Sequence, residues 1–575
     1  MPLRITAYCI LTCLLAASCI TPHKQVAGIQ EQGRDELSPN AGSAYLEYML
    51  GYELEREGKW EDALNRYLNA LTLDPTSLYL KTQVSAMLVR LGKAPEALSN
   101  LEEIIKADPD YVPALMLLGD LYNNQKRVDD AIRIYGHILR IDPGRDEARM
   151  ALGVFYSSKG ELQKSRDVFD DVLKKDPDNI MALYYLGTIN IETKNYDKAE
   201  SLFKRIIELR PSFDASYLSI GLVDELKGDS KGAEEYYRKT LAINPHNLFA
   251  KEKIIQLYLA EKSYDKAIKE LESVLESSPD NIDIRARIGL LYLQERQYDK
   301  ALSEFKTALE TKPDDIALRY YAVLALEELN RYGEAIEELK KILSHDPKNI
   351  NAFLTLALIY SKQNLYADAA RIYEEVLSFE KGKPEIYSYL GDMYIQIKDF
   401  KKAERVLGEG LRLFGNNADL TFAMAILYDK AGRPEDMESY LRQTIKLNPK
   451  HVDALNYLGY SFAEKGVHLQ EALSLIKRAL ELKPDSGYIM DSLGWVYYKL
   501  GRLKEALETL RKAVKLTRDD PVLHEHLGDV YAALGEPGNA VDAWSEALKS
   551  HEKEEGLKAR VEGKIKNLKV EVQNK

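Results

Sequence analysis

Small and apolar positions recur along this chain with a period of 34 residues. The most regular position is a glycine or another uncharged residue, and it advances by 34 twelve times before one step of 35 and a last step of 34. These marker positions are Gly51, Ser85, Gly119, Gly153, Gly187, Gly221, Ile255, Gly289, Val323, Ala357, Gly391, Ala425, Gly459, Gly494 and Gly528. A fixed period of this length predicts stacked copies of one small unit, so we expect an elongated solenoid.

Each unit is predicted to contain two helices. In the unit marked by Gly119, an aromatic residue follows three positions later at Tyr122, and a second pair of small and bulky residues follows at Ala131 and Tyr135. Spacings of three and four place such pairs on single helix faces. Pro143 then ends the second helix, because proline lacks the amide and disfavours helix in the residue before it. The unit is therefore a helical hairpin.

This unit resembles the tetratricopeptide repeat (TPR), over roughly residues 44–551. The run 217–221, followed by Ala233, Tyr237 and Pro245, matches the pattern of that family closely. The resemblance implies an all-α, right-handed superhelical solenoid of about 15 helix-turn-helix repeats. It also implies that the first helix of each repeat lines a concave groove.

Three successive repeats depart from the pattern. Lys381 replaces the proline of repeat ten, Gly415 replaces that of repeat eleven, and Met437 replaces the alanine of repeat twelve. We expect a softer joint near residue 382, which divides the array into residues 44–381 (repeats 1–10) and 382–551 (repeats 11–15). Ordinary drift between repeats is the alternative explanation.

The C-terminal segment, residues 552–575, has apolar residues at helical spacing among lysines and glutamates: Leu557, Val561, Ile565 and Leu568. It is predicted to be a cap helix over the last hairpin, because the end of a solenoid exposes apolar surface that needs cover. A basic helix lying on a membrane surface is the alternative, but the glutamates interrupt its positive charge.

Residues 1–18 have the form of a secretory signal, with Arg4 ahead of a short, mostly apolar run that is too short to cross a bilayer. Residues 15–19 resemble the lipobox of bacterial lipoproteins, which implies that Cys19 is lipidated; Ala16 stands where that family prefers leucine. Ile20 is not aspartate, and the resemblance then implies the outer membrane. An ordinary signal cleaved after Ala17 or Ser18 is the alternative.

Residues 19–43 are polar and contain several glycines, so they are predicted to be a flexible tether. The expected location is therefore the periplasm-facing side of a bacterial outer membrane, with a lipid anchor. All three cysteines fall within the first 19 residues, so the repeats cannot be joined by disulfides.

Composition and motifs point away from nucleic acid and catalysis. The net charge is −12, with no long basic stripe for phosphates, so we do not expect a nucleic-acid partner. The chain has no glycine-rich phosphate loop, HExxH motif or nucleophile elbow. His524 and His526, two apart on a helix, should point in different directions. We therefore expect neither an enzyme nor a cofactor or metal site.

The TPR resemblance also implies which residues form the groove: those six, three and two places before each marker, and one, four and five places after it. The candidate groove residues are Tyr45, Tyr48, Tyr52, Tyr79, Tyr184, Tyr185, Tyr320, Tyr321, Tyr389, Asn456, Tyr457, Tyr460, Tyr488, Asp491, Trp495, Tyr498 and Lys499. Tyrosine and tryptophan supply rigid contact area with a polar tip, which suits an extended polypeptide. The alternative is that these rings pack along the interior and touch only neighbouring helices.

The last three repeats, with "ALNYLGYSFAEKG" followed by "YIMDSLGWVYYKLGRLKEAL", are similar to the C-terminal repeats of TPR lipoproteins from Gram-negative outer membranes. The resemblance implies a periplasmic scaffold for protein–protein interactions. It would recruit a periplasmic protease, another periplasmic enzyme or an envelope-assembly factor, together with its clients. The alternative is a component of an exopolysaccharide or outer-membrane export machine with a carbohydrate-binding groove.

Overall fold

The computed structural model describes residues 41–550, 552, 554 and 556–573. This part of the chain contains 31 α-helices in helix-turn-helix pairs, so the predicted all-α TPR solenoid is confirmed. The predicted signal peptide (1–18), Cys19 and the tether as far as residue 40 lie outside the described residues. The predicted tether end at residue 43 is wrong, because the first helix begins at Ala41.

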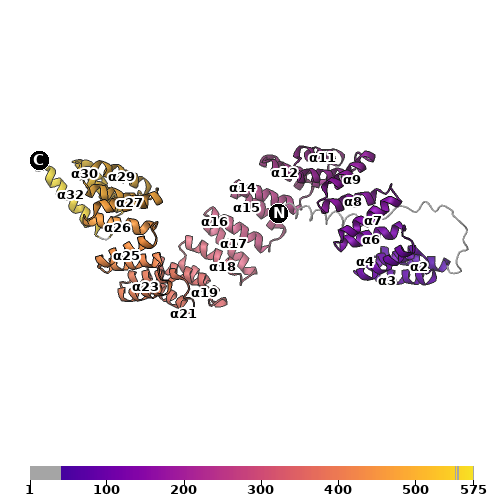
Figure 1. The fold of residues 1–575 in the computed structure, drawn as a ribbon, viewed down its shortest axis with the longest axis horizontal. Coiled ribbons are helices and arrows are strands. Elements are labelled where there is room, and N and C mark those ends of the chain that lie inside the picture. The colour runs from indigo at the N-terminus through magenta and orange to yellow at the C-terminus, as the bar shows by residue number, and fades with distance from the viewer. Residues whose placement is uncertain (1–40, 551, 553, 555, 574–575) are drawn as a thin grey trace. The chain divides into compact units, whose positions relative to one another are not determined.

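Residues 41–263 belong to a first compact unit, drawn from indigo to purple in Figure 1. Its helices are α2 (Ala41–Arg56), α3 (Trp60–Leu73), α4 (Leu78–Arg90), α5 (Ala94–Ala107), α6 (Val112–Asn124), α7 (Val128–Ile141), α8 (Asp146–Ser158), α9 (Leu162–Lys175), α10 (Ile180–Glu192), α11 (Tyr196–Leu209), α12 (Asp214–Lys227), α13 (Ser230–Ile243) and α14 (Leu248–Ala260). From α2 to α13, each odd-numbered helix packs against the even-numbered helix before it, as a hairpin requires.

Residues from Tyr264 onward form a second compact unit. Its helices are α15 (Tyr264–Ser277), α16 (Ile282–Gln294), α17 (Tyr298–Thr311), α18 (Ile316–Glu328), α19 (Tyr332–His345), α20 (Ile350–Lys362), α21 (Tyr366–Phe379), α22 (Pro384–Gln396), α23 (Phe400–Phe414), α24 (Ala418–Lys430), α25 (Pro434–Leu447), α26 (Val452–Lys465), α27 (Leu469–Leu482), α28 (Gly487–Lys499), α29 (Leu503–Leu516), α30 (Pro521–Ala533), α31 (Pro537–Leu548) and α32 (Leu557–Gln573). The joint expected near residue 382 stays a prediction; one buried apolar cluster runs from Phe353 to Val561, on both sides of that residue.

The marker glycine allows the two helices of a hairpin to meet. A β-carbon added to Gly187 in α10 would lie 2.5 Å from ring atoms of Phe203 in α11. Ala199, the small residue of the same repeat, is fully buried. Since one side of the contact has no side chain, the ring can rest on the opposite backbone.

The turn between the paired helices is built on one left-handed residue. Helix α6 ends at Asn124, and Lys126 in the following turn has a φ of 60°. The Lys126 amide donates to the Asn123 carbonyl and the Arg127 amide to the Tyr122 carbonyl, both at 2.8 Å. This is the Schellman arrangement, which satisfies the carbonyls left open at a helix end.

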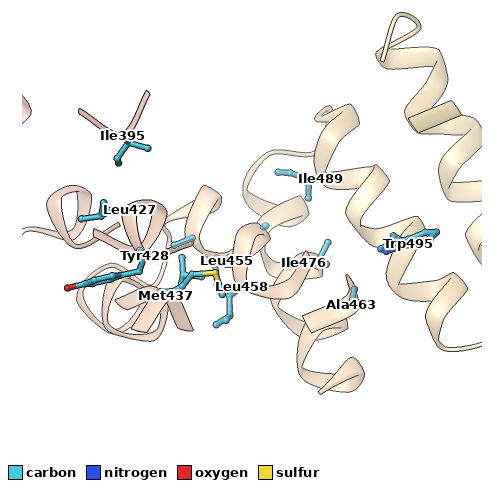
Figure 2. Close-up of a cluster of buried hydrophobic side chains, with 14 of the residues drawn as sticks. Ile395, Leu427, Tyr428, Met437, Leu455, Leu458, Ala463, Ile476, Ile489 and Trp495 are labelled. Atoms are coloured by element: carbon cyan, nitrogen blue, oxygen red, sulfur yellow. The ribbon is translucent and has the colours of Figure 1, made fainter. Parts of the chain in front are cut away.

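Repeat twelve keeps its packing although methionine replaces alanine. Met437 in α25 is 2% exposed, and it belongs to the buried cluster that contains Leu455 and Leu458 of α26 (Figure 2). The longer side chain therefore takes part in the core between two repeats, and this departure from the pattern leaves no opening there.

The last helix covers the end of the array. Leu557 and Val561 of α32 are fully buried, and Ile565 and Leu568 pack against the same cluster. These are the residues predicted for a cap helix; α32 begins at Leu557, five residues after the expected start. Over the described residues, no helix combines the length and the apolar character needed to cross a bilayer.

Candidate functional site

The candidate groove residues of the first repeat form an open tyrosine cluster. Tyr45, Tyr52 and Tyr79 are 65%, 40% and 46% exposed. Tyr48 lies between them: its hydroxyl is 2.7 Å from that of Tyr79, and its ring centroid lies 5.7 Å from that of the buried Tyr67. Tyr48 therefore anchors the cluster, and the rings of the other three tyrosines remain exposed to solvent.

The two candidates of repeat five are core residues. Tyr184 is 3% exposed and makes edge contacts with Phe203 and Phe213, while Tyr185 is 6% exposed and stacks on Phe169 with centroids 5.0 Å apart. Their assignment to an accessible groove is wrong, because hydrophobic burial takes both rings into the interface between neighbouring helices. The alternative of interior packing describes them.

The candidates of repeats nine and eleven differ in exposure. Tyr320 and Tyr321 are half-buried; the Tyr320 hydroxyl bonds to Asn349 Oδ1 at 2.8 Å, and the Tyr321 ring lies 5.5 Å from that of Phe305. Tyr389 is 47% exposed beside Tyr373. Tyr320 and Tyr321 therefore keep only part of their rings available to a partner, whereas Tyr389 is as exposed as Tyr79 of the first repeat.

The candidates of repeats thirteen and fourteen come together around Trp495 of α28. Its indole stacks on Tyr498, with centroids 4.9 Å apart, and on His526 of α30, at 4.0 Å and 17°. Lys499 Nζ lies 4.8 Å from the ring centroid, a cation–π contact. The indole Nε1 donates to Glu464 Oε2 of α26 at 2.7 Å. Because Trp495 is only 7% exposed, it fixes the neighbouring rings and presents little surface itself.

His526 is held by an acid from the repeat before it. Its Nδ1 lies 2.9 Å from Asp491 Oδ1, and both side chains are buried. Burial by itself lowers the pKa of His526, but the charge and hydrogen bond of Asp491 outweigh it and hold the pKa above its ordinary value. The imidazole is therefore stabilised in its charged form.

Two further tyrosines line the same side of the array. The Tyr457 hydroxyl donates to Asp429 Oδ2 at 2.7 Å, and the Tyr488 hydroxyl donates to Asp453 Oδ1 at 2.9 Å. Burial and these carboxylates raise the pKa of both hydroxyls. Tyr488 is 40% exposed, so it offers the most accessible ring of this group.

Two polar candidates differ in their surroundings. Asn456 is 9% exposed, and its Oδ1 has no hydrogen-bond partner in the structure. Tyr460 lies half-buried, with its ring centroid 6.4 Å from that of His526. Tyr460 and Tyr498 therefore place two partly open rings on the first-helix side of the last repeats, whereas the Asn456 acceptor is buried.

Four residues of this site were not among the candidate groove residues: Glu464, Glu525, His526 and Asp529. Each of them occupies a position that the groove rule names. Glu464 lies five places after Gly459, while Glu525, His526 and Asp529 lie three places before, two before and one after Gly528. Extending the rule to repeat fifteen finds three of the four. His524 does point elsewhere, as expected, with Nε2 2.8 Å from the Arg518 carbonyl.

The side chains gathered around Trp495 and His526 in the last repeats are aromatic and acidic. Within the described ranges, no group of three or more histidine, cysteine, aspartate or glutamate side chains is placed to hold a metal ion. Rigid rings beside fixed carboxylates can bind a polypeptide by stacking, by hydrogen bonds and by attraction of its positive charges.

Two family models match the chain. A tetratricopeptide-repeat model matches residues 88–155, 125–181, 156–220, 226–291 and 258–327. A model of the C-terminal domain of cilia and flagella-associated protein 70 matches residues 322–518. The matched TPR families are scaffold families that are typically non-enzymatic.

One curated relative is a TPR repeat-containing protein of Pseudomonas aeruginosa, 36% identical over 103 residues. The match covers 18% of this chain and 18% of that protein. Among solved structures, the APC/C hetero-tetramer Cut9–Hcn1 is 16% identical, with a TM-score of 0.36, over 80% of this chain and 97% of that one. Yeast Tom70 is 14% identical, with a TM-score of 0.32, over 93% and 97%.

The repeat period, the paired helices and the matching repeat model agree. The chain is a tetratricopeptide-repeat protein, a scaffold for protein–protein interactions.

Proposed function

We propose that this protein is a lipid-anchored, periplasm-facing scaffold that recruits a periplasmic protease or an envelope-assembly factor together with its clients. The observation that carries the proposal is the cluster of aromatic and acidic side chains around Trp495, on α26, α28 and α30. A second client-binding segment elsewhere on the array would raise the effective concentration of the two partners for each other.

The groove has the chemistry of a protein-binding site. Trp495 is fixed by Glu464 and His526, so the rings around it lose little conformational freedom when a partner binds. Tyr488 is 40% exposed and Lys499 is partly exposed, which leaves an aromatic ring and a cation for the partner to contact. Rigid aromatic groups of this kind dominate the energy of protein interfaces.

Capture from cell envelopes with the full-length chain tests this groove. The Tyr488→Ala/Lys499→Ala variant should lose its crosslinked partner about tenfold, because each side chain contributes contact energy without carrying the fold. The matched control is Tyr366→Ala/Lys401→Ala, whose residues lie on the second helices α21 and α23. Equal capture by both variants would remove the C-terminal groove from the proposal.

The membrane anchor is proposed from the lipobox resemblance of residues 15–19. A diacylated cysteine with a third chain on its amino group would hold the protein stably, since two or more acyl chains are needed for firm anchorage. Metabolic labelling with palmitate should mark the wild-type chain and the Cys13→Ala control but not Cys19→Ala. Label that persists in Cys19→Ala excludes this anchor.

A polysaccharide-export function is the second candidate, and the tyrosine cluster of the first repeat favours it. Tyr45, Tyr52 and Tyr79 leave three rings open to solvent, and sugar rings stack on such surfaces as readily as peptides do. Binding of purified exopolysaccharide that is lost in Tyr45→Ala/Tyr79→Ala, by a chain that captures no envelope protein, would favour this candidate over the scaffold.

The match of residues 322–518 to the C-terminal domain of cilia and flagella-associated protein 70 raises a third candidate, a scaffold in a cilium or flagellum. This function requires no lipid on Cys19. Absence of palmitate together with fractionation of the tagged chain into the ciliary or flagellar structure would support it and would exclude the envelope location.

A further inference from the structure

The last helix does more than cover the apolar end of the array, because two of its basic residues reach the acidic part of the groove. Arg560 Nη2 lies 3.0 Å from Glu525 Oε2. Lys564 Nζ lies 2.8 Å from Glu525 Oε1 and 2.6 Å from Asp529 Oδ2. Arg560 and Lys564 are four residues apart, so they share one face of α32.

The acids belong to the rigid surface of α30. The side chains of Glu525 and Asp529 are 6% and 11% exposed. Trp544 of α31 fixes them further, since its Nε1 donates to Asp529 Oδ1 at 3.0 Å and lies 3.2 Å from the Glu525 carbonyl. Burial raises the pKa of Glu525, but Arg560 and Lys564 more than offset this effect, so that the pKa falls below its ordinary value.

The cations come from a more exposed element. The side chains of Arg560 and Lys564 are 47% and 33% exposed, several times more than the acids they pair with. Their charges also reach the candidate groove residues: Arg560 interacts electrostatically with Tyr460, and Lys564 with Tyr498. The cation-bearing face of α32 therefore lies at the end of the proposed binding groove.

We propose that α32 is an internal occupant of a site that accepts a basic amphipathic helix from a protein partner. The proposal deepens the scaffold function above and rests on it. If α32 left without replacement, Glu525 and Asp529 would lose their counter-charges, and the apolar surface under Leu557 and Val561 would be exposed, which is costly. A partner helix must therefore supply two cations four residues apart and, beside them, apolar residues that replace Leu557 and Val561.

The test measures whether the site accepts such a helix from outside. The probe is a fluorescein-labelled peptide of residues 556–573, titrated into the full-length chain and followed by anisotropy. Arg560→Glu/Lys564→Glu should expel the internal helix and bind the peptide at least tenfold more tightly than the wild type. Lys558→Glu/Lys566→Glu carries the same charge change on exposed positions of α32 and should bind like the wild type.

Three results would overturn the proposal. In the first, the two variants bind the peptide with equal affinity. In the second, a peptide whose own Arg560 and Lys564 are replaced by glutamate binds as tightly as the unchanged peptide. In the third, the opened variant dimerises and excludes the peptide. Should glutamate disturb the fold of α30, Arg560→Gln/Lys564→Gln gives the same comparison. If the opened variant binds the peptide but no envelope partner is captured through Tyr488 and Lys499, the result counts against the scaffold function and not against the helix-binding site.

Discussion

The ring of Tyr135 in α7 rests directly on the backbone of Gly119 in α6. A β-carbon on Gly119 would lie 2.5 Å from Cε2 of that ring, closer than real β-carbons approach other atoms. The Tyr135 hydroxyl also donates to the carboxylate of Asp120. In most repeats that have a marker glycine, the glycine is thus explained by the large residue that follows it 16 positions later and fills the space between the helices.

Gly119→Ala should therefore destabilise its hairpin by about 1–3 kcal/mol, because the ring must move or the helices must separate. Gly136→Ala is the matched control in α7, where a new β-carbon meets no atom within 4 Å. That change should stabilise the helix by roughly 0.5–1 kcal/mol. Hydrogen exchange of the amides of α6 and α7 measures both, since long arrays do not unfold in two states. If Gly119→Ala did not destabilise its hairpin, or if Gly136→Ala destabilised it as much, this account of the packing would be refuted.

The left-handed turn residues offer a second prediction. Lys126 and Lys194 have φ values of 60°, at the point of the repeat where Gly160 and Gly228 have 78° and 83°. Lys126→Gly and Lys194→Gly should each stabilise the local turn by up to about 1 kcal/mol, because glycine adopts this conformation without a β-carbon clash. Gly160→Ala and Gly228→Ala should have the reverse effect. Local hydrogen exchange at α6, α8, α10 and α12 provides the measurement, and unchanged protection in the glycine variants would contradict the prediction.

Most of the fold could be predicted because the repeat is a local rule. Gly119, Ala131 and Pro143 each set one feature of the hairpin: the close approach, the buried contact and the end of the second helix. The start of α2 at Ala41 could not be found from the pattern, because the first repeat has no preceding repeat to fix its boundary.

The candidate site was predicted less completely, because the groove rule gives the side of a helix and not its accessibility. Tyr184 and Trp495 both satisfy the rule, yet both are buried, the first against phenylalanines and the second against His526. The pairing of α32 with Glu525 was also missed, since it joins segments 35 residues apart in sequence that no periodicity relates.

Alanine substitutions of two candidate groove tyrosines should distinguish a ring that packs in the core from a ring that is available to a partner. Tyr184→Ala removes a ring that is 3% exposed and should cost about 3–5 kcal/mol, as large-to-small changes in cores do. Tyr45→Ala removes a ring that is 65% exposed and should change the free energy of unfolding by less than about 0.5 kcal/mol. Denaturant titration followed by hydrogen exchange at α10 and α2 checks both. Comparable losses would mean that the first-repeat cluster is structural too.

The His526–Asp491 pair should make the last repeats sensitive to pH. The folded-state pKa of His526 lies above its ordinary value of 6.5, so the stability that the pair contributes is fully present below pH 6.5 and is lost as pH rises through the folded pKa. Asp491, Asp529 and Glu525 are the acids that act on the imidazole, and the last two are themselves paired with Lys564. Hydrogen exchange of α28 and α30 across this range should therefore show protection falling towards alkaline pH.

Asp491→Asn is the control for this prediction, because it removes the charge that raises the pKa and leaves burial, which lowers it. In the variant, the imidazole proton resonances of His526 should titrate at a lower pH than in the wild type, and the protection of α28 and α30 should no longer fall as pH rises above 6.5. An unchanged titration of His526 in Asp491→Asn would show that the acid does not hold the proton on the imidazole.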